Sequence, residues 1–236
     1  MTVHHVVEGD GEPLIMSSSL GTTHRMWDPN VPALTTRYRV VGYDHPGHGH
    51  SPPGPRTIEG LAHEVLTLAD DLGLERFAFS GISLGGFLGI WLGANAPERL
   101  DRLFLCCTAP RLPPAQQWLD RAANVRAHGV EFIADSVLAR WFTPGFPDRA
   151  RYRELLTSTP AEGYARCCEA IAPMDLRDEL GRIKVPTTVI FGRHDPVTGN
   201  EPRRLLAEVG DVVELDGAHL ASVEAAGAFN EALLSA

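Results

Sequence analysis

The segment Gly81-Ile82-Ser83-Leu84-Gly85 is the feature that most restricts how this chain of 236 residues can fold. Residues 77–80 alternate between aromatic and small side chains, which predicts a buried strand, and the apolar run 87–94 predicts a helix. A strand that turns directly into a helix crowds the backbone, so small residues are needed on both sides of the serine. The pattern predicts that Ser83 is an exposed nucleophile at the end of the strand, with the backbone N–H of Leu84 directed at the group it attacks. An ordinary turn is the alternative for so short a pattern.

Strand and helix patterns alternate along most of the chain. Further strands are predicted at residues 3–7, 13–16, 39–44, 103–107, 184–191 and 212–215, and helices at 27–34, 58–72 and 201–209. A strand–helix–strand order implies parallel pairing, so the sequence predicts an α/β fold with a mostly parallel central sheet flanked by helices. A hydrophobic content of 44% over this length is sufficient for one such core and short for two independent domains.

Residues 111–183 break this alternation. Segments with helical periodicity at 113–128, 130–142, 148–156 and 161–171 follow one another without a strand between them. We therefore expect a core of residues 1–110 and 184–236, with residues 111–183 inserted after the sixth-strand position as a helical cap. A cap over the edge of the sheet that carries Ser83 would exclude water and shape the substrate pocket. A helical bundle with no role in recognition is the alternative.

Two residues near the end of the chain complete a candidate catalytic site with Ser83. Asp195 follows the predicted strand 184–191, and His219, the one histidine after Asp195, lies in the loop after strand 212–215. The order Ser, Asp, His is that of α/β-hydrolases, so this is the fold we expect. In such a site His219 is the general base, and Asp195 is the buried partner that fixes the imidazole tautomer.

Other titratable groups compete for these roles. The rival acids are Asp211, Asp216 and Glu224, but none of them follows a strand expected beside that of Ser83. The rival base is His194, which neighbours the proposed acid and precedes it.

A loop of small and polar residues, 17–23, follows the predicted strand 13–16. In a serine hydrolase of this architecture, the corresponding loop supplies a second backbone N–H to the oxyanion. Leu20 is the candidate donor, with an ordinary loop as the alternative.

Charge and composition disfavour several classes of partner. The net charge of −9 argues against nucleic acid and anionic membranes, since both would repel the protein surface. The first residues carry no basic segment followed by an apolar run, and no apolar run reaches the length of a membrane span. A cytoplasmic protein is therefore expected.

No metal or cofactor is expected from the motifs. The four cysteines form two adjacent pairs, 106–107 and 167–168, which lack C-x-x-C spacing and are interpreted as small buried side chains. Residues 45–50 include three histidines, but without the helical spacing or cysteine partners that zinc sites use. The glycines around Ser83 do not form a dinucleotide-binding motif.

Longer stretches carry a more specific signal. They are SSLGTTHRMWDPNVPAL, YDHPGHGHS, TIEGLAHEVLTLADDLG, FSGISLGG, ANAPERLDRLFLCCTA, ARWFTP, EGYARCCEAIAPMDLRDEL, GRHDPVT and AHLASVEA. Together the chain resembles the 3-oxoadipate enol-lactonases, capped α/β-hydrolases of the β-ketoadipate route of aromatic degradation. The glycine–serine turn at Ser83 and the motifs around Asp195 and His219 are typical of the whole superfamily. The SLGT loop and the cap segments are what point to the lactonases. Two departures from the family are expected: the first edge strand is missing, and Pro46 stands where relatives often carry arginine.

The resemblance implies a cofactor-free serine hydrolase whose partner is a small lactone or ester, opening 3-oxoadipate enol-lactone to 3-oxoadipate. The carboxylate of this substrate needs a cation in an otherwise acidic protein. Arg140 beside Trp141 in the cap is the candidate, and Arg193 and Arg25 are alternates. For Arg140, a solvated helix face is the alternative. Rival functions are a carboxylesterase, a lactonase for another ring, a non-catalytic binding protein and a perhydrolase.

Overall fold

One twisted sheet organises the protein. The computed structural model describes residues 3–112 and 114–236, so Pro113, the first residue of the predicted helix 113–128, lies outside the described residues. Within these ranges seven strands pair in the order β1-β3-β2-β4-β5-β6-β7. They are β1 (His5–Glu8), β2 (Glu12–Ser17), β3 (Tyr38–Tyr43), β4 (Phe77–Ile82), β5 (Leu100–Cys106), β6 (Thr187–Gly192) and β7 (Asp211–Leu215). β1 is antiparallel to β3 and the other pairs are parallel, which confirms the predicted α/β class.

The position of each strand in the sheet determines how many of its side chains are buried. Every residue of β4 and of β6 is buried, as expected for central strands of a parallel sheet that is covered by helices on both faces. β7 lies at the edge and is mostly exposed. Because β2 to β7 run parallel, their carboxyl ends share one edge of the sheet.

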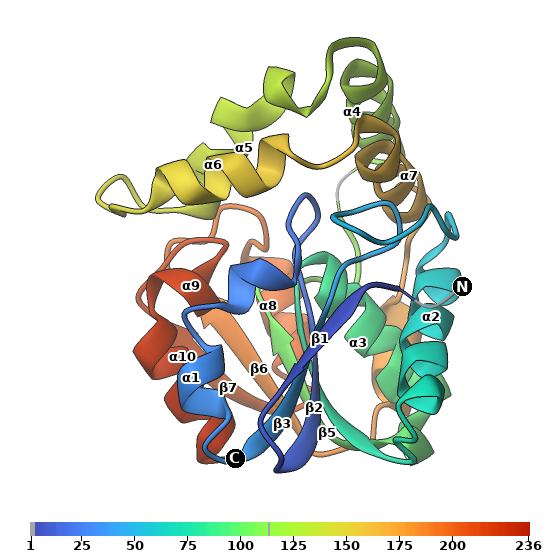
Figure 1. The fold of residues 1–236 in the computed structure, drawn as a ribbon, viewed down its shortest axis with the longest axis vertical. Helices are drawn as coiled ribbons and strands as arrows, with labels where there is room; N and C mark the ends of the chain where they lie inside the picture. Colours follow the sequence, from blue (N-terminus) through green and yellow to red (C-terminus); the bar gives the residue numbers. More distant parts are fainter. Residues whose placement is uncertain (1–2, 113) are drawn as a thin grey trace.

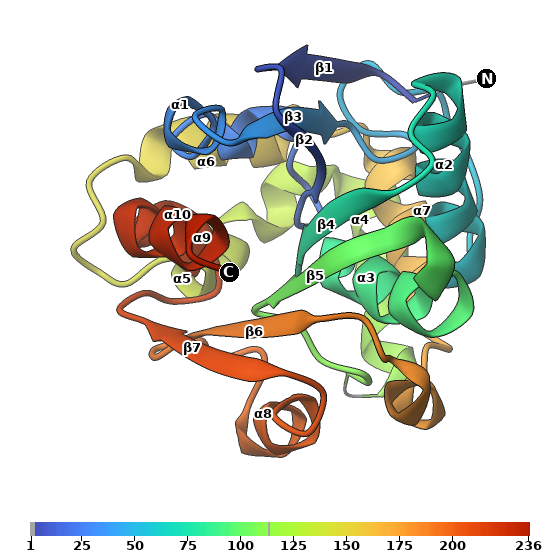
Figure 2. The same ribbon diagram turned by 90° about the horizontal axis from the view of Figure 1, so that it is seen from below.

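Helices cover both faces of the sheet (Figure 2). α1 (Val31–Leu34), α9 (Ala221–Glu224) and α10 (Ala226–Leu234) lie on one face, and α2 (Ile58–Asp71), α3 (Leu84–Asn95) and α8 (Asn200–Leu206) lie on the other. α2 buries Leu61, Val65 and Leu68, whose three-to-four spacing is typical of a helix with one buried face. α3 is buried almost all round, because it packs beneath the sheet directly after Ser83.

A second helical layer lies over the carboxyl edge of the sheet (Figure 1). It contains α4 (Ala115–His128), α5 (Ala134–Trp141), α6 (Arg149–Thr157) and α7 (Ala161–Ile171). An ion pair of 2.7 Å between Arg126 Nε and Glu162 Oε2 joins α4 to α7. The single helix predicted at 130–142 is instead a 3-10 turn, Val130–Ile133, followed by α5. Phe132 lies in that turn and is exposed.

No helix within residues 3–112 and 114–236 is both long enough and apolar enough to cross a membrane.

Candidate active site

Ser83 lies at the sharp turn between β4 and α3. Its backbone has φ 55° and ψ −111°, a conformation that costs a non-glycine residue of order 1–3 kcal/mol and occurs mainly at functional sites. A Cβ added at Gly81 would lie 2.1 Å from the carbonyl oxygen of Gly85, and one added at Gly85 would lie 2.2 Å from that of Ser17. The two glycines are therefore required by the close approach of the backbone on both sides of Ser83.

The imidazole of His219 lies between Ser83 and Asp195. Its Nε2 is 2.9 Å from Ser83 Oγ, and its Nδ1 is 3.1 Å from both carboxylate oxygens of Asp195. Ser83 follows β4, Asp195 follows β6 and His219 follows β7, so the parallel sheet brings three distant segments to one edge. With its Nδ1 proton held by the carboxylate, the imidazole has Nε2 free to accept the hydroxyl proton.

Asp195 is held as a carboxylate. Its Oδ1 accepts a hydrogen bond of 2.8 Å from Val197 N, and its Oδ2 accepts one of 2.9 Å from Thr198 Oγ1. Burial raises the pKa of Asp195, but His219 and these two donors outweigh it and hold the pKa below its ordinary value. The negative charge is thus maintained beside the imidazole.

The rival groups have other partners. His194 Nε2 lies 3.1 Å from Asp216 Oδ1, and both side chains are exposed. The carboxylate of Glu224 accepts hydrogen bonds from two backbone N–H groups at 3.0 and 2.8 Å. Asp211 is the first residue of β7, at the opposite end of that strand from the loop of His219.

The loop after β2 lies against the turn that carries Ser83. Leu20 lines the same cavity as Ser83. The N–H of the next residue, Gly21, donates to His48 Nε2 at 3.2 Å, a contact that does not involve the N–H of Leu20. Leu84 follows Ser83 as the first residue of α3, where backbone N–H groups have no partner within the helix.

Two buried histidines support this loop. His45 Nε2 donates to the carbonyl oxygen of Ser18 at 2.8 Å, and Gly85 N donates to the same oxygen at 3.2 Å. Burial lowers the pKa of His45 to about 4 and that of His48 to about 3, so both imidazoles are neutral near pH 7. The sequence drew attention to these histidines only as weak metal candidates and did not reveal that they support the loop.

A cavity of about 210 Å³ opens beside Ser83 and His219. Its walls include Trp118 and Arg121 of α4 and Tyr164 of α7. Among the described residues that line it there is no Asp or Glu. A cavity of this size suits a small ligand, and its charge favours an anionic one.

Comparison with known proteins agrees with the geometry. A family model described as "alpha/beta hydrolase fold" matches residues 12–226. The chain belongs to the α/β-hydrolase fold family. It is 40% identical over 236 residues to 3-oxoadipate enol-lactonase 2 of Acinetobacter baylyi, covering 96% of this chain and 88% of the relative. It is 36% identical over 220 residues to 3-oxoadipate enol-lactonase 1 of the same organism, covering 89% and 83%. The crystal structure of the enol-lactonase from Burkholderia xenovorans LB400 superposes with a TM-score of 0.94 at 40% identity, covering 99% of this chain and 95% of that one.

Two arginines of this α/β-hydrolase face the cavity. Arg140 and Trp141, both predicted, line it from α5. Burial, and then the charge of Arg121, lower the pKa of Arg140. Arg121, which the sequence analysis did not identify, lies 4.7 Å from the ring centroid of Trp118, three residues earlier on the same helix. Within the described parts of the chain, neither Arg121 nor Arg140 forms an ion pair with a carboxylate.

The other two predicted arginines do not line the cavity. Arg193 is exposed at the end of β6, and its Nε lies 2.9 Å from Glu214 Oε1 because β6 and β7 are neighbours. Arg25 is exposed in the 3-10 turn His24–Trp27.

Proposed function

We propose that this α/β-hydrolase opens a small enol-lactone that carries a carboxylate, converting 3-oxoadipate enol-lactone to 3-oxoadipate in the β-ketoadipate pathway. The observation that carries the proposal is the 2.9 Å contact between His219 Nε2 and Ser83 Oγ beside a cavity lined by Arg121 and Arg140. The names of the relatives from Acinetobacter baylyi and Burkholderia xenovorans support the choice of lactone.

In the first half of the proposed reaction, Ser83 Oγ attacks the ring carbonyl carbon while its proton passes to His219 Nε2. Asp195 remains ionised and stabilises the imidazolium through Nδ1. The backbone N–H groups of Leu20 and Leu84 would stabilise the negative charge that develops on the carbonyl oxygen.

Collapse of this intermediate breaks the bond between the carbonyl carbon and the ring oxygen. The ring oxygen leaves as an enolate, which is a weaker base than an alkoxide, and its protonation by His219 gives an enol that tautomerises to the ketone. A water molecule then gives a proton to His219 and attacks the ester on Ser83. The proton returns to Ser83 Oγ as 3-oxoadipate leaves, so the enzyme is regenerated.

The charge of the cavity supports a carboxylate-bearing substrate. Arg140 would bind the carboxylate, with Arg121 as a second donor and Trp141 against the ring. Residues 111–183 would act as the cap of a core formed by residues 1–110 and 184–236, since α4, α5 and α7 contribute to the cavity lining. The cytoplasmic location stays a prediction.

The test is a comparison of kcat/KM for 3-oxoadipate enol-lactone, saturated lactones and p-nitrophenyl esters. We expect the enol-lactone to be preferred, and Ser83→Ala to lower kcat by about 10⁴-fold or more. Ser80→Ala is the matched control, because Ser80 Oγ is buried in β4 without a hydrogen-bond partner. A preference for simple esters by orders of magnitude would instead assign a carboxylesterase, and failure of a fluorophosphonate to label Ser83 would contradict serine catalysis.

A further inference from the structure

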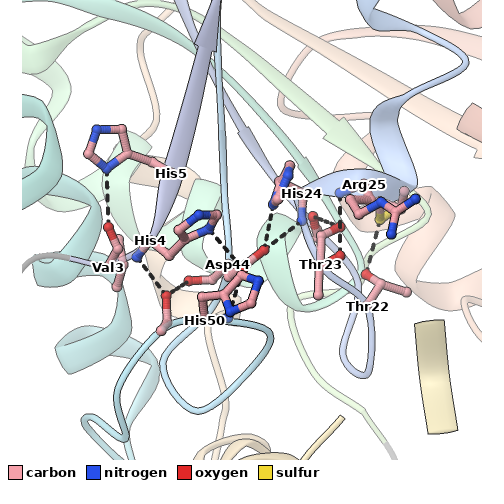
Figure 3. Close-up of polar contacts among 12 residues, drawn as sticks. Val3, His4, His5, Thr22, Thr23, His24, Arg25, Asp44 and His50 are labelled. Carbon is pink, nitrogen blue, oxygen red and sulfur yellow. Dashed lines mark hydrogen bonds and ion pairs between the residues drawn. The ribbon is translucent and has the colours of Figure 1, made fainter. Parts of the chain in front are cut away.

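A cluster of histidines surrounds a buried carboxylate outside the active-site cavity (Figure 3). His24 Nδ1 lies 2.8 Å from Asp44 Oδ1, and His4 Nδ1 lies 3.1 Å from Asp44 Oδ2. The ligand atoms of the three residues lie within 4.8 Å of one another. They come from three separate segments: the chain before β1, the 3-10 turn after the loop of Leu20, and the end of β3.

Asp44 is prepared to carry a negative charge in this cluster. Its side chain is only 1% exposed, and it accepts further hydrogen bonds from His24 N at 2.9 Å and His50 N at 3.1 Å. Burial opposes ionisation, but the hydrogen bonds from His24 and His50 outweigh it and lower the pKa of Asp44 to about 2.

The histidines are more accessible than the carboxylate. The side chain of His24 is 19% exposed and that of His4 is 34% exposed, so the cluster opens to solvent on its imidazole side. The ring of exposed His50 packs edge-on to His4 with a centroid distance of 5.0 Å. Figure 3 shows these three rings around the Asp44 carboxylate, whereas His5 points away from it and contacts Val3.

We propose that His4, His24 and Asp44 form a binding site for one divalent transition-metal ion, with Zn²⁺ as the ion that best matches the donor set. Imidazole nitrogen and carboxylate oxygen are preferred zinc ligands, and such sites take a fourth ligand from solvent or another side chain. That position is open to water or to the His50 imidazole. The cluster is separate from the proposed hydrolysis, because none of its three residues lines the cavity of Ser83.

The ligand atoms have to move closer together to hold one ion. Ligand atoms around a tetrahedral zinc ion lie about 3.3 Å apart, given metal–ligand bonds of about 2.0–2.1 Å. His24 Nδ1 lies 2.8 Å from Asp44 Oδ1 and His4 Nδ1 lies 3.1 Å from Asp44 Oδ2, each within about half an ångström of that value, and all three ligand atoms lie within 4.8 Å of one another. Rotation of the partly exposed His4 side chain can bring its Nδ1 closer to that of His24. Both Nδ1 atoms then bind the metal in place of donating a proton to Asp44.

The bound ion would join the segment before β1 to the 3-10 turn that follows the loop of Leu20. An ion that binds only the folded state stabilises it in proportion to RT ln(1 + [Zn²⁺]/Kd), so the proposal predicts a rise in melting temperature with added zinc. This readout is independent of activity on any lactone.

The experiment uses the full chain without a histidine tag, freed of metal with a chelator and titrated with ZnCl₂ by calorimetry and thermal unfolding. We expect one ion per chain, and about tenfold or more weaker binding in His4→Ala and in His24→Ala. His5→Ala, one residue from His4 but directed away from Asp44, and His63→Ala on α2 are the controls and should bind zinc as the wild type does. Titration with Co²⁺ gives visible absorption bands that should weaken in the same two variants.

The proposal is overturned if the wild type shows neither heat of binding nor a thermal shift in about tenfold molar excess of zinc. It is also overturned if His4→Ala binds as tightly as the wild type, or if His5→Ala loses as much affinity as His4→Ala. Should His24→Ala not fold, His4→Ala and its His5→Ala control decide the question, since His4 lies near the end of the chain and is partly exposed.

Discussion

The backbone N–H of His219 donates a 3.2 Å hydrogen bond to the carbonyl oxygen of Arg140. The next residue repeats the contact, because Leu220 N donates to the carbonyl oxygen of Trp141 at 2.9 Å. The last carbonyl groups of a helix have no partner within it, so the end of α5 is free to accept both bonds. The same helix end therefore holds the loop of the candidate base and presents Arg140 to the cavity.

Glu224 reinforces the connection between the end of α5 and the loop of His219, and Glu224→Gln should weaken that connection. Its carboxylate accepts hydrogen bonds from Thr143 N at 3.0 Å, just beyond α5, and from Ala218 N at 2.8 Å, directly before His219. Glutamine loses the charge and one acceptor. We expect the free energy of unfolding to fall by about 1–2 kcal/mol. We expect kcat to fall by about tenfold with little change in KM, because the imidazole would be misplaced.

Urea unfolding and steady-state kinetics on the enol-lactone measure these effects. Glu231→Gln, on the exposed side of α10, is the matched control and should leave both quantities unchanged. An unchanged kcat in Glu224→Gln, despite lower stability, would limit Glu224 to a structural role.

The two arginines of the cavity should determine the preference for anionic lactones. In Arg121→Ala or Arg140→Ala the substrate carboxylate loses a charged hydrogen-bond donor worth about 1.5–3 kcal/mol, so KM for an anionic lactone should rise about 10- to 100-fold. KM for a neutral lactone should stay within a factor of a few. Arg193→Ala is the control, since Arg193 pairs with Glu214 outside the cavity. If Arg140→Ala leaves KM for the anionic lactone unchanged, Arg140 does not bind the carboxylate.

Asp44 should contribute a stability that depends on pH. Its folded pKa is lowered from 3.8 to about 2, a difference that corresponds to about 2 kcal/mol. Because the folded pKa is the lower one, this stabilisation is fully present above the unfolded pKa near 4 and is lost as the pH falls from about 4 towards 2. Asp44→Asn should therefore be less stable than the wild type by about 2 kcal/mol near pH 6, and the difference should shrink near pH 2.5.

Urea unfolding in the presence of a chelator, at both pH values, tests this expectation without interference from metal. Asp211→Asn, an exposed carboxylate at the start of β7, is the control and should show no difference of this size at either pH. A difference between Asp44→Asn and wild type that is the same at both pH values would contradict the role assigned to ionised Asp44.

The sequence was sufficient to predict the parts of the fold that depend on local patterns. The turn at Ser83 has its own glycine signature, and buried strands such as β4 and β6 appear as short apolar runs. Parallel strands share their carboxyl edge, so the positions of Asp195 and His219 after two such strands were enough to expect them near Ser83. Their observed contacts agree with that expectation.

The cavity wall was harder to predict. The helices over the sheet edge pack against one another on one side and line the cavity on another. A polar residue that faces a cavity has the same periodicity as one that faces solvent, so Arg121 was not distinguished from the exposed side of α4. Arg193 was an alternate candidate for the substrate carboxylate, but its side chain pairs with Glu214 on the neighbouring strand. The cluster around Asp44 was not visible either, since its members are about 20 residues apart and meet only in the folded chain.

The close packing at Gly85 gives the last prediction. Alanine usually stabilises a helix relative to glycine, but a Cβ at residue 85 would lie 2.2 Å from Ser17 O at the start of the loop that carries Leu20. Gly85→Ala should therefore destabilise the protein by about 1–3 kcal/mol, because the loop has to move away. It should also lower kcat, because the N–H of Leu20 moves with the loop.

Gly227→Ala in α10, where a Cβ meets no atom within 4 Å, should instead raise stability by about 0.5–1 kcal/mol. If the loop packs as described, thermal unfolding should show a lower melting temperature for Gly85→Ala and a higher one for Gly227→Ala, and kinetics should show a lower kcat for Gly85→Ala. A wild-type melting temperature and kcat in Gly85→Ala would show that the loop can shift without consequence.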